Sequence, residues 1–227
     1  VKDNLKNYNF HKLSRELLNF CALDLSSFYF DIRKDVLYCD ALNSKKRGNC
    51  VVVLNIILES LLKWFAPILV FTTEEIYTLI KKKEESIHEN SFAQIPPNWK
   101  NNDLNDKWTK LFKIKQEANI AIEEKRSNKE IGSSLEAKIV IFIEDTQYVA
   151  LLEEIDIEEI CIVSKVEIIK DNIVDGAYKE DSLVGLGIVV SPALGKKCLR
   201  CWKIDDKIDN SLADPLCDRC LEVVKQK

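Results

Sequence analysis

Two stretches near the C-terminus decide how the last part of this chain folds: Lys197-Cys198-Leu199-Arg200-Cys201-Trp202 and Cys217-Asp218-Arg219-Cys220. Each contains a CxxC pair, and fifteen residues separate the two pairs. A CxxC turn points two sulfurs at one position, so two such turns can place four thiolates around one tetrahedral zinc ion. Because four protein ligands leave no position open for water or substrate, we expect one structural, non-catalytic zinc. The predicted ligands are Cys198, Cys201, Cys217 and Cys220.

Two disulfide bonds are the alternative use of these four cysteines. Nothing else in the sequence resembles a secreted protein, since no apolar signal segment opens the chain. The remaining cysteines are scattered, and several adjoin apolar residues, as small core side chains do. A reduced, cytoplasmic protein fits better. These other cysteines are Cys21, Cys39, Cys50 and Cys161.

Length and composition describe a globular protein. The chain has 227 residues, 46% of them hydrophobic, which is enough for two or three units. No apolar run approaches the roughly 18 residues of a membrane helix. The net charge of −4 argues against non-specific coating of nucleic acid. The sequence contains no methionine and starts at Val1, from which we expect a piece of a longer polypeptide.

The first part of the sequence has helical periodicity. Apolar residues recur three or four positions apart from Leu13 to Leu25 and from Val51 to Phe65, which predicts two helices that pack through these stripes. Pro67 should end the second helix. Thr72 and Glu75 form a capping box that should start a third.

The second part has a different pattern. A long helix is expected from about Lys107 to Lys129, with Gly132 stopping it. From Ala137 to Ile143 an alternating pattern is apolar on both faces, which predicts a strand covered on both sides. The remaining expected elements are a short helix at 147–154 and strands at Ile160–Val166 and Gly187–Val190.

A polar stretch at 86–106, with Pro96-Pro97 and several asparagines, predicts a linker between the two parts. The fold class expected is mainly α. The predicted domains are a helical bundle at 1–97, a long helix plus a small α+β connecting domain at 98–190, and a four-cysteine zinc-binding, zinc-ribbon-like domain at 191–227.

The sequence offers no candidate catalytic residue. Its two histidines, His11 and His88, lie in no nucleophile or metal motif, and ordinary surface or packing roles account for them. It also contains no glycine-rich phosphate loop.

Four blocks of the sequence, taken in order, carry a family resemblance. They are Phe20-Cys21-Ala22-Leu23-Asp24-Leu25-Ser26-Ser27-Phe28-Tyr29 with Lys34-Asp35-Val36-Leu37-Tyr38; Ala66-Pro67-Ile68-Leu69 with Phe71-Thr72 and Glu74-Glu75-Ile76; Ile131-Gly132-Ser133-Ser134-Leu135-Glu136-Ala137; and Lys197-Cys198-Leu199-Arg200-Cys201-Trp202. They resemble the C-terminal part of bacterial isoleucyl-tRNA synthetase, a class I aminoacyl-tRNA synthetase, over nearly the whole chain. Phe30 and Tyr77 depart from the family's usual Leu and Trp, and neither departure puts a site in doubt.

The resemblance implies a helical anticodon-binding bundle, a small connecting domain and a zinc-binding tail, which together grip the anticodon arm of isoleucine tRNA. In this family ATP activates isoleucine on a separate Rossmann-type domain marked by HIGH and KMSKS strings, and an editing domain hydrolyses mischarged valine. Neither string occurs here. The expected partners are therefore isoleucine tRNA and the catalytic and editing domains of the same polypeptide, without DNA or a membrane. We expect a cytoplasmic monomer that does not aminoacylate by itself and whose parent uses ATP only in the absent catalytic domain.

The resemblance also implies that Arg200 and Trp202 contact the anticodon. A zinc turn fixes the backbone beside Cys201, so an indole there can stack rigidly on an unpaired base. The alternative is that Trp202 packs over the small core of the zinc hairpin. The expected basic face consists of Lys196, Lys197, Arg200 and Lys203.

Other interpretations compete with this one. Valyl- and leucyl-tRNA synthetases are similar in the helical bundle but resemble the tail poorly. A DNA-repair glycosylase has a similar C-terminal zinc finger, but it uses an N-terminal proline followed by glutamate, where this chain has Val1-Lys2. A purely structural zinc interaction module would bind neither RNA nor DNA.

Overall fold

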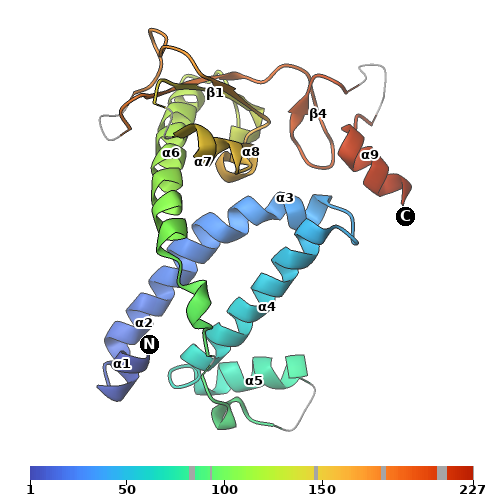
Figure 1. The fold of residues 1–227 in the computed structure, drawn as a ribbon. Coiled ribbons are helices and arrows are strands. Elements are labelled where there is room, and N and C mark those ends of the chain that lie inside the picture. Colours follow the sequence, from blue (N-terminus) through green and yellow to red (C-terminus); the bar gives the residue numbers. More distant parts are fainter. Residues whose placement is uncertain (82–84, 93, 146–147, 180–182, 209–213, 227) are drawn as a thin grey trace. The chain divides into compact units, whose positions relative to one another are not determined.

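The computed structural model describes residues 1–81, 85–92, 94–145, 148–179, 183–208 and 214–226, which divide into two compact units (Figure 1). Unit 1 spans Val1–Lys100 and unit 2 spans Asn101–Lys227. Their boundary lies inside the predicted linker. As predicted, the protein is mainly α, with a small sheet and the cysteine cluster in unit 2.

The described part of unit 1 is helical, as the apolar stripes predict. Leu13, Leu17 and Leu25 of the first stripe are buried, but Val51 and Leu58 of the second are exposed, so the prediction that two helices pack through both stripes is wrong. The elements are α1 (Lys2–Lys6), α2 (Phe10–Asn19), the π-helix η1 (Phe20–Phe30), α3 (Asp31–Cys39), α4 (Lys45–Phe65), α5 (Val70–Lys81), and the short 3-10 helices η2 (Ile87–Glu89) and η3 (Pro97–Trp99).

The π-helix η1 departs from the 3.6-residue period that the sequence suggests. A π-helix bonds each N–H to the carbonyl five residues earlier. The hydroxyl of Ser27 follows the same spacing, since it donates to the Ala22 carbonyl at 2.8 Å. The ring of Phe20 packs against Trp64 of α4, with 6.4 Å between centroids. The most recognisable block of the sequence therefore has an unusual backbone that packs on α4.

Helix α4 ends at Phe65, just before the predicted stop at Pro67. The next helix, α5, begins already at Val70. The prediction that Thr72 and Glu75 form a capping box is wrong, because both residues lie inside the helix. The turn around Pro67 is short, so α5 begins at Val70, two residues before the predicted cap at Thr72.

Helix α4 exposes much of its apolar surface. Within the described parts of the chain, it is long and apolar enough to cross a membrane by length and composition alone. Mostly buried core helices of soluble proteins pass the same test, whereas only 17% of the apolar window of α4 is buried in this structure. The exposed apolar residues of α4 are Val51, Val52, Val53, Ile56 and Leu58.

Unit 2 opens with the long helix α6 (Asn102–Ser127). It begins earlier than predicted because the Asn101 side chain caps it, accepting a hydrogen bond from the N–H of Leu104 at 3.0 Å. After its C-terminus Lys129 takes the left-handed conformation, with φ of 60°. Gly132, the predicted stop, lies beyond that point, so the helix is confirmed but its stop residue is wrong.

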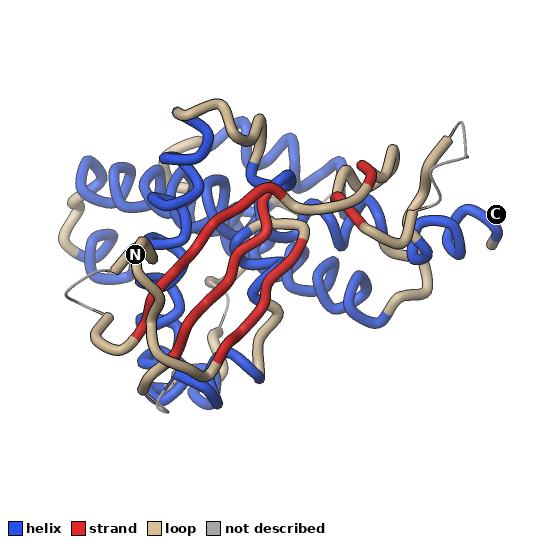
Figure 2. The backbone as a smooth tube through the Cα atoms, turned by 90° about the horizontal axis from the view of Figure 1, so that it is seen from above, coloured by secondary structure: helices blue, strands red, loops and turns tan. Residues whose placement is uncertain are grey.

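Three strands form a sheet in the order β2-β1-β3, seen face-on in Figure 2. Strand β1 pairs in parallel with β2 and antiparallel with β3. The strand predicted at Ala137–Ile143 is confirmed. Alternate residues of β1 are fully buried and those between them are half-buried, so one face is covered completely and the other only in part. Helices α6, α7 and α8 lie on one side of the sheet (Figure 1). The strands are β1 (Ala137–Ile143), β2 (Lys165–Ile169) and β3 (Leu186–Pro192).

Two short helices connect β1 to β2. They are α7 (Val149–Glu153) and α8 (Ile157–Cys161). The first agrees with the short helix expected at 147–154. The strand expected at Ile160–Val166 is wrong except for Lys165 and Val166, which lie in β2. Upstream of them the Asp156 carboxylate accepts a hydrogen bond from the N–H of Glu159 at 3.1 Å and caps a helix.

The end of the chain forms a separate small motif within unit 2, which we call the cysteine module (residues 196–226). Strand β3 runs to Pro192, past the predicted end at Val190. At Gly195 φ is +123°, and a Cβ would lie 2.3 Å from the Asp205 carbonyl carbon, so only glycine fits. The elements of the module are β4 (Lys196–Lys197), β5 (Ile204–Asp205) and α9 (Asp218–Lys225).

Candidate metal centre

The hairpin β4–β5 positions the first cysteine pair. The N–H of Cys198 donates to the carbonyl of Lys203 at 2.9 Å, and the carbonyl of Cys198 accepts from the N–H of Trp202, also at 2.9 Å. These two bonds close a tight turn around Cys201. The sulfurs of both cysteines therefore point inward from one rigid loop.

Helix α9 positions the second pair. Cys217 is the N-cap residue of this helix, and Cys220 lies in its first turn. The N–H of Cys217 donates to Sγ of Cys198 at 3.4 Å, and the N–H of Leu199 donates to the carbonyl of Pro215 at 3.0 Å. These two hydrogen bonds hold the second cysteine pair against the turn that contains the first.

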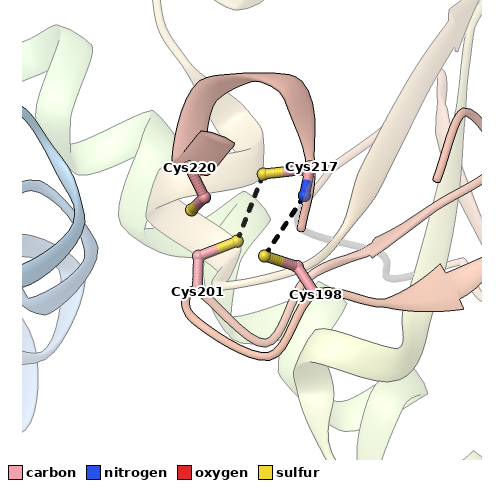
Figure 3. Close-up of side chains that lie close together, drawn as sticks. All are labelled: Cys198, Cys201, Cys217 and Cys220. Atoms are coloured by element: carbon pink, nitrogen blue, oxygen red, sulfur yellow. Dashed lines mark hydrogen bonds between the residues drawn. The ribbon is translucent and has the colours of Figure 1, made fainter. Parts of the chain in front are cut away.

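The four sulfurs point toward one another (Figure 3) and lie within 4.8 Å of each other. Those of Cys201 and Cys217 are 3.7 Å apart, much farther than the roughly 2.05 Å of a disulfide. A tetrahedral zinc with bonds of about 2.3 Å separates its sulfurs by about 3.8 Å. The cluster therefore fits a tetrahedral metal ion, and the disulfide alternative does not describe this pair.

Two opposing effects act on the thiols. Burial raises the pKa of Cys198, but hydrogen bonds from the backbones of Cys201, Cys217 and Arg200 outweigh it and lower the pKa to about 6. Burial raises the pKa of Cys201 to about 11 and also raises that of Cys217, and the neighbouring sulfurs add to both effects. A bound cation would favour the thiolate forms of Cys201 and Cys217 against this effect of burial.

Arg200 lies beside this cluster. Its Nη1 donates to Sγ of Cys220 at 3.5 Å. Four thiolates and one Zn2+ would carry a formal charge of about −2, which a neighbouring guanidinium partly offsets. Arg200 therefore contacts one of the four clustered cysteines directly.

Trp202 stands out for its exposure and its backbone. Its side chain is 60% exposed, so the indole is not packed into a hairpin core. Its φ of 67° lies in the left-handed region, which is exceptional for a bulky residue. A large apolar ring is held in the solvent next to a metal ligand.

The predicted basic face is partly neutralised. Lys197 Nζ lies 3.8 Å from Glu136, and Lys203 Nζ lies 3.6 Å from Glu158, so both lysines form ion pairs with the preceding part of unit 2. Lys196 sits opposite Asp205 in the β4–β5 hairpin. Glu136 and Glu158 carry no sequence signal for these contacts, because no local spacing links either residue to the lysine that it meets.

A model for the anticodon-binding domain of tRNA ligases matches residues 1–141, which is more than half of the chain. The chain belongs to this family. The match covers unit 1, helix α6 and most of β1, whereas α7, α8 and the cysteine module lie outside it.

Curated relatives of this chain are named isoleucine–tRNA ligases. The one from Pelagibacter ubique is 50% identical over 204 residues, which are 90% of this chain and 21% of the relative. Those from Bartonella quintana and Agrobacterium fabrum are each 39% identical, over 92% and 90% of the chain. The chain thus spans about one fifth of the length of these relatives. The resemblance to isoleucyl-tRNA synthetases is confirmed.

Proposed function

We propose that this chain binds the anticodon arm of isoleucine tRNA as part of an isoleucine–tRNA ligase. The membership in the anticodon-binding domain family and the names of the relatives support this function. The DNA-repair glycosylase interpretation is not retained, because the family match is to tRNA ligases.

The observation that carries the proposal is the exposed indole of Trp202 beside a metal ligand. Unpaired anticodon bases present flat faces, and stacking on an aromatic side chain contributes about 1 to 3 kcal/mol per base. A ring fixed by the turn around Cys201 loses little conformational freedom on binding, which favours such stacking.

Basic side chains of the cysteine module supply the second contribution. Residues 196–227 contain eight Lys or Arg and six Asp or Glu, and a tetrathiolate zinc site adds about −2, so the module is formally neutral. Affinity then comes from a local face, with modest salt dependence. The proposed tRNA contacts are Arg200, Trp202, Lys196, Lys197 and Lys203.

The metal we propose is a single structural zinc bound by the four clustered cysteines. Tetrahedral sites of four thiolates are typical of structural zinc, and no ligand position is left for a reacting molecule. The proposed ligands are Cys198, Cys201, Cys217 and Cys220.

The chemistry of the parent enzyme takes place outside this chain. The parent attaches isoleucine to its tRNA using ATP, in a catalytic domain that works with an editing domain of the same polypeptide, and this chain alone is inactive. We place the enzyme in the cytoplasm as a monomer. We also retain the division into a bundle at 1–97, a connecting domain at 98–190 and a zinc domain at 191–227.

The test compares Trp202→Ala with Trp99→Ala in the full-length ligase. Trp99 is a matched control, because its side chain is 56% exposed but adjoins no metal ligand. We expect Trp202→Ala to raise the KM for isoleucine tRNA roughly 5- to 150-fold, which corresponds to about 1 to 3 kcal/mol. Zinc content and isoleucine activation should remain unchanged in both variants. If Trp202→Ala and Arg200→Ala both stay folded and both leave the KM unchanged, the cysteine module is only a structural cap.

A further inference from the structure

The cysteine module meets the rest of unit 2 at a polar joint. A groove of about 420 Å3 runs along this joint. Apolar packing does not fill it, so the direction of the module depends on individual polar contacts. The residues lining it from both sides include Glu158, Ser164, Lys165, Lys203, Asp205 and Asp206.

The hydroxyl of Ser164 joins the two sides. Ser164 precedes β2, and its backbone N–H donates to the carbonyl of Ala137 at 3.1 Å, which fixes it to the sheet. Its hydroxyl donates to the carbonyl of Leu135. The same oxygen accepts a hydrogen bond from the N–H of Ile204 in β5 at 2.6 Å. Because the hydroxyl proton is bonded to the carbonyl of Leu135, the oxygen lone pairs point in a defined direction, toward the N–H of Ile204 in the hairpin.

The bonded residue is close to the exposed indole along the chain. Ile204 follows Trp202 by two positions, and the carbonyl of the intervening Lys203 accepts from the N–H of Cys198. The segment between them is therefore held in the metal-binding turn. Moving Ile204 moves the turn and the direction in which the ring of Trp202 projects.

The other links across the joint restrain direction less. Lys203 lies 3.6 Å from Glu158, and Lys165 lies 3.8 Å from Asp206. A third ion pair joins Lys197 of the module to Glu136 at 3.8 Å. Each pair includes a long lysine side chain, and Lys165 and Asp206 are well exposed, so many rotamers satisfy these contacts. The bond to Ser164 instead joins a backbone N–H to a short side chain on a fixed strand end.

We propose that Ser164 is a positioning residue for RNA recognition: it orients the cysteine module on the sheet and thereby aims Trp202 at the anticodon. This inference rests on the proposed function for its RNA part only. The orientation of the module can be measured without any RNA.

The first measurement uses the 227-residue chain with zinc bound. Hydrogen exchange at the N–H of Ile204 is compared among wild type, Ser164→Ala, Ser164→Thr and the control Ser191→Ala. Ser191 lies on β3, is half-buried like Ser164, and its side chain makes no hydrogen bond to the described residues. We expect exchange to rise about tenfold in Ser164→Ala alone, with zinc content unchanged and the Thr hydroxyl restoring protection.

The second measurement is a double-mutant cycle with Trp202→Ala, read as the KM for isoleucine tRNA in the full-length ligase. Ser164→Ala should raise this KM roughly fivefold in the wild-type background and leave it unchanged in the Trp202→Ala background, because its effect passes through the indole. Isoleucine activation should be unaffected throughout.

The outcomes separate the two proposals. Unchanged exchange at Ile204 in Ser164→Ala overturns the positioning role, whatever happens with tRNA. Faster exchange together with additive effects of Ser164→Ala and Trp202→Ala on KM overturns the link to the indole and leaves the proposed function intact. If Trp202→Ala has no effect on KM, the stacking role proposed for Trp202 and the RNA part of this inference fail together, and exchange at Ile204 still decides whether Ser164 orients the module.

Discussion

Position 202 is costly for a tryptophan. A residue with a Cβ loses about 1 to 2 kcal/mol in the left-handed region, whereas glycine enters that region freely. The indole of Trp202 gains little packing in return, since most of it faces solvent. Strained residues of this kind tend to cluster at functional sites. We interpret the tryptophan as retained for a contact with an external partner.

Comparing Trp202→Gly with Trp202→Ala isolates this backbone cost, because both variants lack the ring. We expect the glycine variant to be more stable than the alanine variant by about 1 kcal/mol, since relief of the left-handed strain exceeds the greater flexibility of unfolded glycine. Denaturant unfolding of the zinc-loaded chain, followed by a probe in the cysteine module, measures the difference.

The tRNA affinity of the same two variants provides the control. Both should lose it equally, because neither has a ring to stack. A glycine variant less stable than the alanine variant would mean that position 202 is not strained in solution.

The candidate site was only partly predictable from sequence. The CxxC spacing identifies the four cysteines, because ligand geometry at such turns is local. The exposure of Trp202 and the contact of Arg200 with Cys220 depend on how the two turns face each other. Ser164 carries no sequence signal, since its role arises from residues that are distant along the chain.

At the scale of elements, sequence signals predicted the structure correctly where the structure depends on neighbouring residues alone. Pro67 ended α4, and alternation found β1, because each depends on near neighbours. The π-helix η1 was missed, since its bonding to the carbonyl five residues earlier leaves no distinct periodic signal in so short a segment. Helix α8 was mistaken for a strand because a short apolar run fits both. The pair Asp156 and Glu159, read as a capping box, would have identified that helix.

The cysteine module should depend on its metal as a single element. Replacing Cys217 with Ser removes one thiolate, and we expect bound zinc to fall from about one per chain to nearly none. The module then unfolds, because so short a segment has too little core to fold alone, while the helices of unit 1 remain. Elemental analysis and hydrogen exchange of the two units measure this.

Zinc affinity should also rise with pH, because binding releases the protons held by buried thiols such as Cys201, whose pKa burial raises to about 11.

Cys21→Ser is the matched control for this experiment. Cys21 is half-buried in η1, outside the cluster, so its substitution should leave the zinc content at about one per chain. Full zinc occupancy in Cys217→Ser, or a mass that reveals two disulfides in the untreated protein, would contradict the assignment of the cluster.

For the whole molecule we expect no catalysis of isoleucine activation. The sequence contains neither a glycine-rich phosphate loop nor the HIGH and KMSKS strings of the resembling family. Pyrophosphate exchange with isoleucine and ATP, measured on the purified 227-residue chain, should equal that of a mock preparation. Exchange clearly above that background would mean that ATP binds in a way this fold does not suggest.

The exposed apolar side chains of unit 1 have a consequence for the solvent in which this chain is handled. Phe71 is 89% exposed and Leu79 is 71% exposed on α5, and α4 adds its row of valines. Sulfate is excluded from protein surfaces and so strengthens the association of apolar groups, whereas low concentrations of urea weaken it. Ammonium sulfate should therefore precipitate the isolated chain early in a salt fractionation, and chromatography on a phenyl resin should retain it through the helices of unit 1.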